Sequence, residues 1–386
     1  WRSGEPLIYM ALPAWFVKVT EFRDRMVELN HKEIEWLPEH IRDGQFGKWL
    51  EGARDWNISR TRYWGAPIPV WMSDDDNYPR MDVYGSLDEL ERDFGVRPES
   101  LHRPHIDELV RPNPDDPTEK STMRRVPDVL DCWFESGSMP FAQHHYPFEN
   151  KELFEQGGFP ADYISEAIDQ TRGWFNSLHQ IGTMVFDSVA YKSVICAGHF
   201  LDEKGQKMSK SKGNVIDPLG IIDELGADPL RFTMAILSGT RDIKLSKQRI
   251  EGYRNFGTKL WNAARFSQMN EARRVEGFDP ATVDQTINRW IRGELTKAER
   301  AVSEAIEGGR FDDAAGALYR FIWNVFCDWY LELAKPVLAG GYFPTTSATD
   351  SAATNATSET KATAAWVLDQ ALKLLHPITP YVTEEL

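Results

Sequence analysis

Apolar and polar positions follow one pattern in the middle of the chain and another towards its end. Short apolar runs at 161–165 and 192–197 flank a segment, 170–186, whose apolar residues recur with the period of a helix. This order predicts a strand, a helix and a second strand, which together form a βαβ unit of a parallel sheet with a right-handed crossover. Ligands of such sheets bind outside the carboxyl ends of the strands. We therefore expect residues 165–170 and 198–212 to share one rim of the sheet.

Two helix starts are expected shortly after this unit. Asp217 has the pattern of an N-cap residue for a helix that runs to Leu225. Asp228, followed by Pro229, has the pattern of an N-cap residue with proline at the first helical position. The chain is expected to become helical from there on.

The strand pattern ends at about residue 247, and a helical domain is predicted beyond it. Four segments have apolar residues at the helical period, namely 250–269, 286–306, 311–338 and 364–375. In the third segment one apolar stripe consists of Leu318, Phe321, Ile322, Val325 and Trp329, and the other side holds Trp323, Phe326 and Tyr330. A helix that is apolar on all sides belongs inside a bundle, so these aromatic residues are assigned to the core.

Three other segments differ in composition. Segment 1–72 alternates aromatic runs with charged helical stretches, which predicts mixed α/β structure. Segment 73–125 holds an acidic run and a proline-rich stretch at 111–117, which favours a solvated, connective insertion over core strands. The tract 345–360 contains almost only Thr, Ser, Ala, Asn, Asp and Glu, which bury too little apolar surface to offset the entropy of ordering. We expect that tract to be a mobile loop.

Composition and charge limit the class of protein. With 41% apolar residues the chain can bury cores for two or three domains, and its net charge of −15 argues against nucleic-acid binding through overall positive charge. The three cysteines lie far apart, so we expect no disulfide framework, no protein-bound zinc and a cytoplasmic location. Charged residues interrupt the most apolar stretch, 319–338, so no membrane partner is expected. The chain lacks a signal peptide and an initiating methionine, and we expect it to be a piece of a longer protein.

A lysine-rich loop after the second predicted strand is the strongest candidate for chemistry. Residues 207–214 read Lys-Met-Ser-Lys-Ser-Lys-Gly-Asn, and the flexible ammonium groups of such a loop can follow the oxygens of a nucleoside triphosphate. The stretch does not match the Gly-x4-Gly-Lys-Ser/Thr phosphate loop, and most short lysine clusters are solvated surface loops. Composition alone leaves these two interpretations open.

Residues 207–211, Lys-Met-Ser-Lys-Ser, resemble the signature of the class I aminoacyl-tRNA synthetases and stand where that family carries it. The resemblance implies that Lys207 and Lys210 are catalytic and bind charge that develops on pyrophosphate when the amino-acid carboxylate attacks ATP. It also implies further ATP-binding residues, namely Gly198, His199, Met208, Ser209 and Ser211. ATP is expected to enter with Mg²⁺ as its counter-ion. His199 considered alone would be an ordinary polar loop residue.

Four other motifs narrow the resemblance within this class. Residues 55–60 and 63–71 resemble the isoleucine, valine and leucine members of the family. Residues 128–138 and 169–175 resemble the isoleucine members more closely than the valine members. The activity implied is the ATP-dependent activation of L-isoleucine to isoleucyl-adenylate and its transfer to tRNA(Ile).

The same resemblance implies a pocket for the amino acid and its adenylate, formed by Trp133, Glu166, Asp169, Gln170 and Trp174. The two indoles would enclose the branched side chain, and the carboxylates would lie near the ribose or the amino group. Ala167 stands where the family commonly has glycine, a departure that bears on a close backbone contact with the ribose. Trp64 and Trp71 carry no such signal and are assigned to packing.

The fold class implied is α/β, with the C-terminal half of a Rossmann-type parallel-sheet catalytic domain followed by an all-α helical bundle of the anticodon-binding type. We expect residues 1–72 to return from an editing insertion, 73–125 to be a connective insertion, 126–246 to complete the catalytic domain, and 247–386 to be a truncated anticodon-binding domain. The family's His-Ile-Gly-His motif and its editing domain are absent from the sequence. The chain alone is therefore expected to form no adenylate.

Two alternatives stay open at this point. A valyl-tRNA synthetase has the same loop and fold, and comparing isoleucine with valine in ATP–pyrophosphate exchange would separate the two. The helical region could also be a tRNA-binding module without catalytic function, because it carries Arg254, Lys259, Arg265, Arg273 and Arg274. These basic residues could equally form a solvated face.

Overall fold

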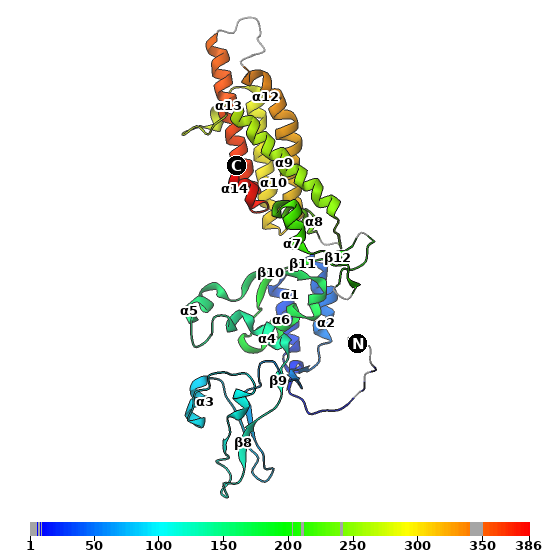
Figure 1. Cartoon of the computed structure of the whole chain (residues 1–386), viewed down its shortest axis with the longest axis vertical. Helices are drawn as coiled ribbons and strands as arrows, with labels where there is room; N and C mark the ends of the chain where they lie inside the picture. The colour runs from blue at the N-terminus through cyan, green and yellow to red at the C-terminus, as the bar shows by residue number, and fades with distance from the viewer. Residues whose placement is uncertain are drawn as a thin grey trace. The chain divides into compact units, whose positions relative to one another are not determined.

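The computed structural model describes residues 6, 8, 10–202, 204–209, 212–239, 242–339 and 350–386. The chain forms two compact units, the first ending at Ile195 and the second beginning at Cys196. Figure 1 colours the first unit blue to green and the mainly helical second unit green to red. Within the described ranges, every helix is too short or too polar to cross a membrane.

The central sheet has three strands in the order β10-β11-β2. β10 (Ala161–Ala167) is followed by a 3-10 turn (Ile168–Arg172), helix α6 (Trp174–Phe186) and β11 (Tyr191–Ala197). β11 pairs in parallel with β2 (Glu35–Leu37), with Ser193 opposite Glu35. The strand, helix and strand predicted from the apolar pattern are therefore confirmed.

Helices α1 (Arg23–Glu33) and α6 pack together in the core of the first unit. The Trp36 ring lies 4.8 Å from Phe46 and 5.9 Å from Phe175, and all three side chains are buried. Beside them His179 is fully buried, and its Nε2 lies 2.8 Å from Met26 O. Aromatic packing thus fixes α6, whose first residue is the predicted pocket residue Trp174. Two further short helices of this region are α2 (Gly47–Glu51) and α5 (Lys151–Leu153).

Helix α4 (Cys132–Ala142) packs closely against α6. A Cβ atom at Gly137 would lie 2.8 Å from both Ile181 Cδ1 and Ser177 O, so only glycine allows this approach. Two pairs of short antiparallel strands lead into the helix: β1 (Phe16–Val17) with β3 (Trp56–Asn57), and β4 (Ser59–Arg60) with β9 (Val129–Leu130).

Segment 73–125 contributes to a small antiparallel sheet in the order β6-β5-β8-β7. Its strands are β5 (Val70–Ser73), β6 (Met81–Val83), β7 (Arg111–Pro112) and β8 (Thr122–Arg125), and α3 (Leu87–Phe94) accompanies them. Trp71, Tyr84, Leu90, Ile106 and Met123 form its core. The prediction of a solvated insertion without core strands is wrong, because β6, β7 and β8 lie in this segment and enclose a buried core. Pro112 is accommodated on an edge strand, and Asp74 accepts the Thr122 N–H at 2.7 Å. The prolines and acids that suggested solvation are compatible with this sheet.

The second unit is built mainly from helices. They are α7 (Pro218–Leu225), α8 (Ala227–Leu237), α9 (Lys247–Met269), α10 (Thr286–Glu307), α11 (Phe311–Tyr319), a π-helical segment (Arg320–Tyr330), α12 (Leu331–Leu338), α13 (Asp350–Leu375) and α14 (Pro380–Glu385). All four segments with helical periodicity are helices, as predicted. Asp217 caps α7, as expected, by accepting the Leu219 N–H at 3.0 Å.

Asp228 does not cap α8, contrary to prediction. The helix begins one residue earlier, at Ala227, with Gly226 in the N-cap position. The Asp228 carboxylate accepts the N–H groups of Tyr381 at 3.3 Å and Val382 at 2.6 Å. It therefore satisfies the first turn of α14, a long-range role that local sequence does not reveal.

The π-helical segment changes which aromatic residues are buried. Phe326 and Tyr330 are fully buried as predicted, but Trp329 is 62% exposed. A π-helix holds more residues in each turn than an α-helix, so positions that follow the α-helical period rotate out of the core. Assigning Trp329 to the core is therefore wrong.

The tract expected to be a mobile loop is helical from Asp350 onward, and residues 345–349 lie outside the described part of the chain. Ala356 and Thr360 are buried in the helical unit. Thr360 Oγ1 accepts a hydrogen bond from Asn288 Nδ2 at 3.1 Å, and Tyr330 Oη donates to Asn288 Oδ1 at 2.9 Å. Small side chains let the helix approach its neighbours closely, and this buried network compensates for the low apolar content.

Candidate functional site

A cleft of about 660 Å³ in the first unit contains one of the predicted pocket residues, Trp133. The cleft is lined by three tryptophans, Trp49, Trp56 and Trp133, and by three arginines, Arg54, Arg60 and Arg172. Trp133, in the first turn of α4, is 40% exposed, so its indole is available to a ligand. Aromatic walls with a few oriented polar groups are typical of small-molecule sites.

The buried side chain of Asp131 contacts two residues that line this cleft, Arg60 and Trp56. The Asp131 side chain is only 5% exposed, and its Oδ2 lies 3.0 Å from Arg60 Nη2. The same oxygen accepts a hydrogen bond from Trp56 Nε1 at 3.2 Å. One buried carboxylate thus orients both an indole and a guanidinium on the surface of the cleft.

Gly173 brings Trp133 and Gln170 together at the start of α6. A Cβ atom at Gly173 would lie 2.7 Å from Gln170 Oε1 and 3.0 Å from Trp133 Cη2. Gln170 Oε1 accepts the Trp174 N–H at 3.0 Å, so the amide begins the helix and has a fixed orientation. The structure therefore places these two predicted residues next to the same glycine, Gly173.

Gln170 lies beside the cleft without lining it, and the other three predicted pocket residues do not line it either. Glu166 and Asp169 are exposed on β10 and the following turn, and Trp174 is half-buried with its ring 6.4 Å from Phe175. Gln45 anchors the turn by donating to Thr171 Oγ1 at 3.0 Å. The predicted roles of Glu166, Asp169 and Trp174 stay predictions.

Several lining residues were missed from sequence. The Arg172 guanidinium lies 5.4 Å from the centre of the Trp49 ring, within cation–π range. Arg60 and Asp131 belong to the segments that carry the family resemblance, which is the signal that could have identified them. Trp49 has no comparable signal.

The two tryptophans assigned to packing differ from each other. Trp71 is buried in the small sheet and donates to Leu109 O at 2.7 Å, as a packing residue should. Trp64 is 64% exposed and stacks on His102 at 4.6 Å. The packing assignment is confirmed for Trp71 and wrong for Trp64.

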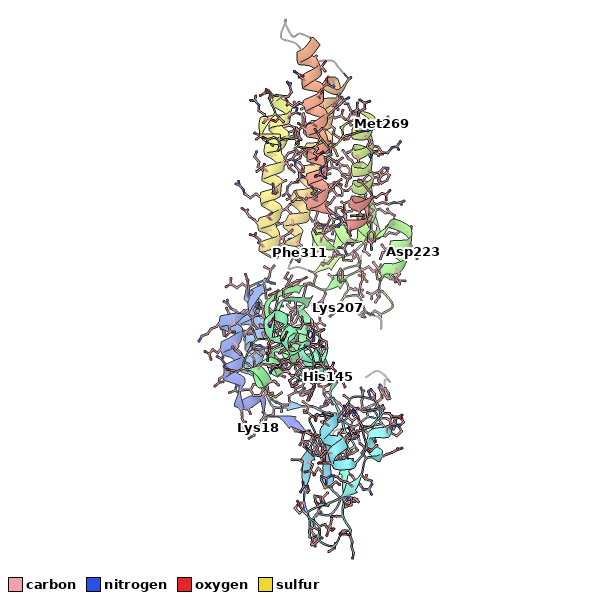
Figure 2. All side chains as sticks on the ribbon, turned by 90° about the vertical axis from the view of Figure 1, so that its left-hand side faces the viewer. Lys18, His145, Lys207, Asp223, Met269 and Phe311 are labelled. Atoms are coloured by element: carbon pink, nitrogen blue, oxygen red, sulfur yellow. The ribbon has the colours of Figure 1, made fainter. Side chains whose placement is uncertain are left out.

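The lysine loop of the second unit begins at a short parallel strand pair. β12 (Phe200–Leu201) pairs with β13 (Ile243–Lys244), and Lys207 forms an antiparallel bridge to Leu201. Lys207, labelled in Figure 2, is exposed, and its Nζ lies 3.3 Å from His199 Nε2. The His199 N–H donates to Asp242 Oδ1 at 2.9 Å. Lys207 and His199, predicted separately, are therefore neighbours.

The remaining predicted residues of the loop have different positions. Gly198 follows β11, and the Met208 side chain packs on an apolar cluster that includes Ile221 and Leu225. The Ser209 N–H donates to Asn214 Oδ1 at 2.9 Å. The predicted residues Lys210 and Ser211 lie outside the described part of the chain. Asn214 and its partner Asp202 were not predicted as site residues.

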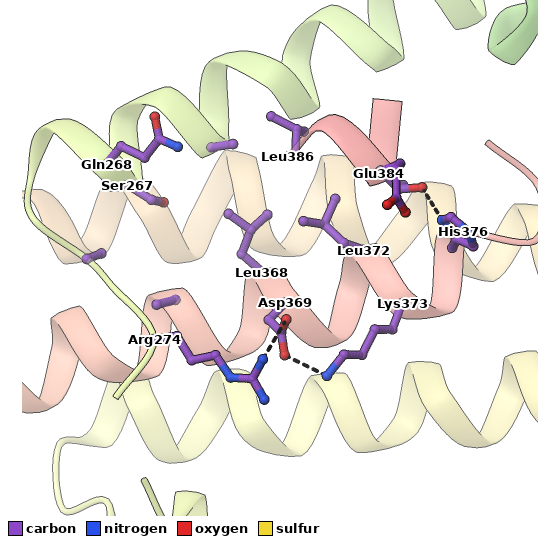
Figure 3. Close-up of a pocket in the computed structure, with 14 residues that line it drawn as sticks. Ser267, Gln268, Arg274, Leu368, Asp369, Leu372, Lys373, His376, Glu384 and Leu386 are labelled. Carbon is purple, nitrogen blue, oxygen red and sulfur yellow. Dashed lines mark hydrogen bonds and ion pairs between the residues drawn. The ribbon is translucent and has the colours of Figure 1, made fainter. Parts of the chain in front are cut away.

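A second cavity, of about 490 Å³, lies in the helical unit between α9, α13 and α14. Figure 3 shows Arg274 and Lys373 both directed towards Asp369. Lys373 Nζ lies 2.8 Å from Asp369 Oδ2, and Arg274 Nη1 lies 4.0 Å from Oδ1. Lys259 forms an ion pair with Asp328. Two of the five basic residues noted in the sequence are thus next to carboxylates, which weakens their case as a phosphate-binding face.

Within the described ranges, no three His, Cys, Asp or Glu side chains lie close enough to hold a metal ion. The three cysteines are free thiols. Burial raises the pKa of Cys327 to about 12, so this thiol is inert at neutral pH.

Comparison with protein families gives two matches. Residues 4–246 match the model of class I tRNA synthetases for I, L, M and V, and residues 288–386 match the anticodon-binding domain of tRNA ligases. The chain is 61% identical over 310 residues, 79% of its length, to an isoleucine–tRNA ligase of Corynebacterium diphtheriae, and covers 29% of that protein. It is 52% identical over 338 residues, 87% of its length, to that of Mycobacterium tuberculosis, and covers 32% of it. The chain thus spans about a third of the length of these relatives.

Solved structures support the same fold. A methionyl-tRNA synthetase of Mycobacterium tuberculosis bound to methionyl-adenylate superposes with a TM-score of 0.69, covering 99% of this chain and 64% of that one at 18% identity. A leucyl-tRNA synthetase of Agrobacterium radiobacter in complex with tRNA gives 0.64, covering 89% of this chain and 44% of that one, also at 18% identity. The parallel sheet with a following helical domain is therefore a shared architecture.

Proposed function

The chain belongs to the class I tRNA synthetases of the isoleucine, leucine, methionine and valine group, and we propose that it is a part of an isoleucine–tRNA ligase. The observation that carries this proposal is the identity of 61% and 52% to isoleucine–tRNA ligases over most of the chain. No observation favours valine as the substrate. The whole protein would activate L-isoleucine with ATP and Mg²⁺ and transfer it to tRNA(Ile).

In the proposed reaction Lys207 stabilises the triphosphate. Its ammonium group is exposed, and the strand pair at the start of the loop fixes its backbone. A cation held in this way can bind negative charge that grows as pyrophosphate leaves. Lys210 would act in the same way, and Gly198, His199, Met208, Ser209 and Ser211 would contact ATP.

The proposed amino-acid site is the wall of the cleft at Trp133, with Gln170 beside it at Gly173. The 40% exposed indole offers a flat apolar face for a branched side chain, and the Gln170 amide is fixed beside it. Glu166, Asp169 and Trp174 complete the site in the proposal, near the ribose and the amino group. The isolated chain spans only about a third of its relatives' length, so we expect it to form no adenylate by itself.

The proposed tRNA contacts lie in the helical part of the chain. This proposal keeps the division into 1–72, 73–125, 126–246 and 247–386, and the match of 288–386 to an anticodon-binding domain supports its last segment. We place the protein in the cytoplasm, because its three thiols are unpaired.

Amino-acid-dependent exchange of pyrophosphate into ATP tests the proposal. The full-length protein should catalyse exchange with isoleucine in preference to valine, and residues 1–386 alone should not. Exchange that depends on valine or leucine instead would overturn the assignment of the amino acid. Robust exchange by the isolated chain would show that the proposed missing half is dispensable.

A further inference from the structure

Asn214 joins the two ends of the lysine loop through its side-chain amide. Its Oδ1 accepts the Ser209 N–H at 2.9 Å, and its Nδ2 donates to Asp202 Oδ2 at 2.9 Å. The same Nδ2 makes a longer contact, 3.4 Å, with Lys207 O. A single side chain therefore holds the backbone on both sides of Met208.

The Asp202 carboxylate determines which way this amide faces. Its Oδ1 accepts the N–H groups of Lys204 at 3.0 Å and Gln206 at 2.8 Å, which leaves Oδ2 for Asn214. An ionised carboxylate only accepts hydrogen bonds, so the NH₂ group of Asn214 must face it and the carbonyl must face Ser209. The hydrogen bond from Asn214, followed by that from Gln206, lowers the pKa of Asp202 and keeps it ionised at neutral pH.

Two further contacts restrict the loop. The Met208 N–H donates to Phe200 O at 2.9 Å, and its side chain packs beside Ile221. Gly205 has φ of 75°, a conformation that favours glycine, and it forms the turn that Asp202 closes. With the strand, the turn and Met208 fixed, the Asn214 amide adds a contact that holds the backbone N–H of Ser209.

We propose that Asn214, oriented by Asp202, is a positioning residue that holds the backbone of Lys207 and Ser209 where their groups meet the phosphates of ATP. This inference rests on the proposed function of the loop. Asn214 itself touches no substrate and acts through the backbone of its two neighbours. Preorganised groups of this kind accelerate a reaction because they need no rearrangement when charge develops.

Exchanging the two side chains gives a direct test in the full-length protein. Asn214→Asp places two carboxylates against each other and removes the donor to Asp202. The double variant Asp202→Asn with Asn214→Asp restores the pair with donor and acceptor reversed and with the net charge of the wild type. In the double variant the amide oxygen introduced at position 202 still accepts the N–H groups of Lys204 and Gln206. The second oxygen of the carboxylate introduced at position 214 still accepts the N–H of Ser209.

We expect Asn214→Asp to lower kcat of isoleucine-dependent exchange by about tenfold or more, and the double variant to recover to within about threefold of the wild type. The KM for isoleucine should stay unchanged, because the variants alter none of the proposed pocket residues. The midpoint of thermal unfolding should also stay unchanged, which separates positioning from a general loss of fold.

Hydrogen–deuterium exchange provides a measurement that does not depend on activity. The peptide that covers residues 200–209 should exchange faster in Asn214→Asp and return to the wild-type rate in the double variant. Wild-type exchange rates in Asn214→Asp, or no recovery in the double variant, would overturn the positioning role. A wild-type protein that shows no isoleucine-dependent activity would contradict the proposed function, and the peptide measurement would still decide whether Asn214 orders the loop.

Discussion

The cleft of the first unit and the lysine loop of the second control their polar groups in opposite ways. In the cleft, Asp131 is 5% exposed, and α4 and α6 approach so closely that Gly137 has no room for a Cβ atom. In the loop, Lys207 is exposed, and the chain is held by hydrogen bonds of Asn214 and Asp202 at the surface. Packing determines the shape of the first region, and hydrogen bonds determine that of the second.

This difference predicts how substitutions divide between stability and rate. A change beneath the cleft removes or crowds buried atoms, so it alters the free energy of unfolding. A change in the loop affects groups that water can replace, so it alters the reaction with little effect on stability. Four predictions test this contrast, and they are arranged from the largest expected effect on stability to the smallest.

Acid should destabilise the first unit through His179. Burial lowers its pKa to about 4, its Nε2 faces Met26 O, and its Nδ1 has no partner among the described residues. The unfolded chain binds the proton near the ordinary pKa of about 6.5, so between about pH 6.5 and 4 it holds more protons than the folded chain and stability falls as pH is lowered. The loss attributable to His179 should reach about 3 kcal/mol at pH 4.

Denaturant titrations at several pH values measure this loss, with His179→Gln as the comparison. The variant keeps a donor for Met26 O but has no titrating ring, so the wild type should lose more stability than the variant across this window. Equal pH dependence in both proteins would contradict the prediction.

Crowding the contact between α4 and α6 should have the next largest effect. In Gly137→Ala the new Cβ would meet Ile181 Cδ1 and Ser177 O at 2.8 Å, and a backbone oxygen cannot move aside easily. We expect a loss of about 2 kcal/mol in denaturant titrations. Gly44→Ala is the matched control, because nothing lies within 4 Å of its added Cβ, and it should leave stability unchanged or slightly higher.

Local sequence predicts the elements whose stability is local. The apolar periods of β10, α6 and β11, and the cap of α7 by Asp217, need only neighbouring residues, and these predictions are confirmed. The small sheet was missed because Trp71 and Met123 meet in its core although they are far apart in sequence. Its prolines and acidic residues are typical of a solvated segment, and only the pairing of its strands shows that they belong to a sheet.

The same distinction applies to the helix that was expected to be a loop. Low apolar content suggested that residues 350–360 would stay mobile, but Thr360 is buried and hydrogen-bonds with Asn288, which also accepts from Tyr330. Those partners come from three separate helices, so no local composition could indicate them.

The candidate site was predicted in part. The family motifs indicated Trp133, Gln170, Lys207 and His199 as candidate residues. In the structure Trp133 lies near Gln170, and Lys207 lies near His199. The buried carboxylate of Asp131 and the amide of Asn214 support those residues from beneath or beside them. Supporting roles of this kind depend on orientation in three dimensions, which spacing along the chain does not specify.

Neutralising Asp131 should have a smaller effect than crowding. Asp131→Asn keeps the shape and can still accept from Trp56 Nε1, but it loses the charge that faces Arg60 at 3.0 Å. Because Arg60 is partly exposed and can be solvated, we expect a loss of only about 1 kcal/mol. Asp162→Asn breaks an ion pair with Lys192 at the surface and should change stability by less than about 0.5 kcal/mol in the same measurement.

Removing the charge of Lys207 should have the smallest effect on stability and separate the two regions most clearly. Lys207→Gln retains most of the length of the side chain, and the exposed ammonium group contributes little to folding, so the free energy of unfolding should change by less than about 0.5 kcal/mol. The rate of isoleucine-dependent exchange by the full-length protein should nevertheless fall by about a hundredfold, because a cation is lost where charge develops. Lys192→Gln, which removes an exposed lysine from β11, should change neither quantity. If Lys207→Gln instead lowered stability as much as Gly137→Ala, the loop would also be a packed region, and the contrast between the two sites would be wrong.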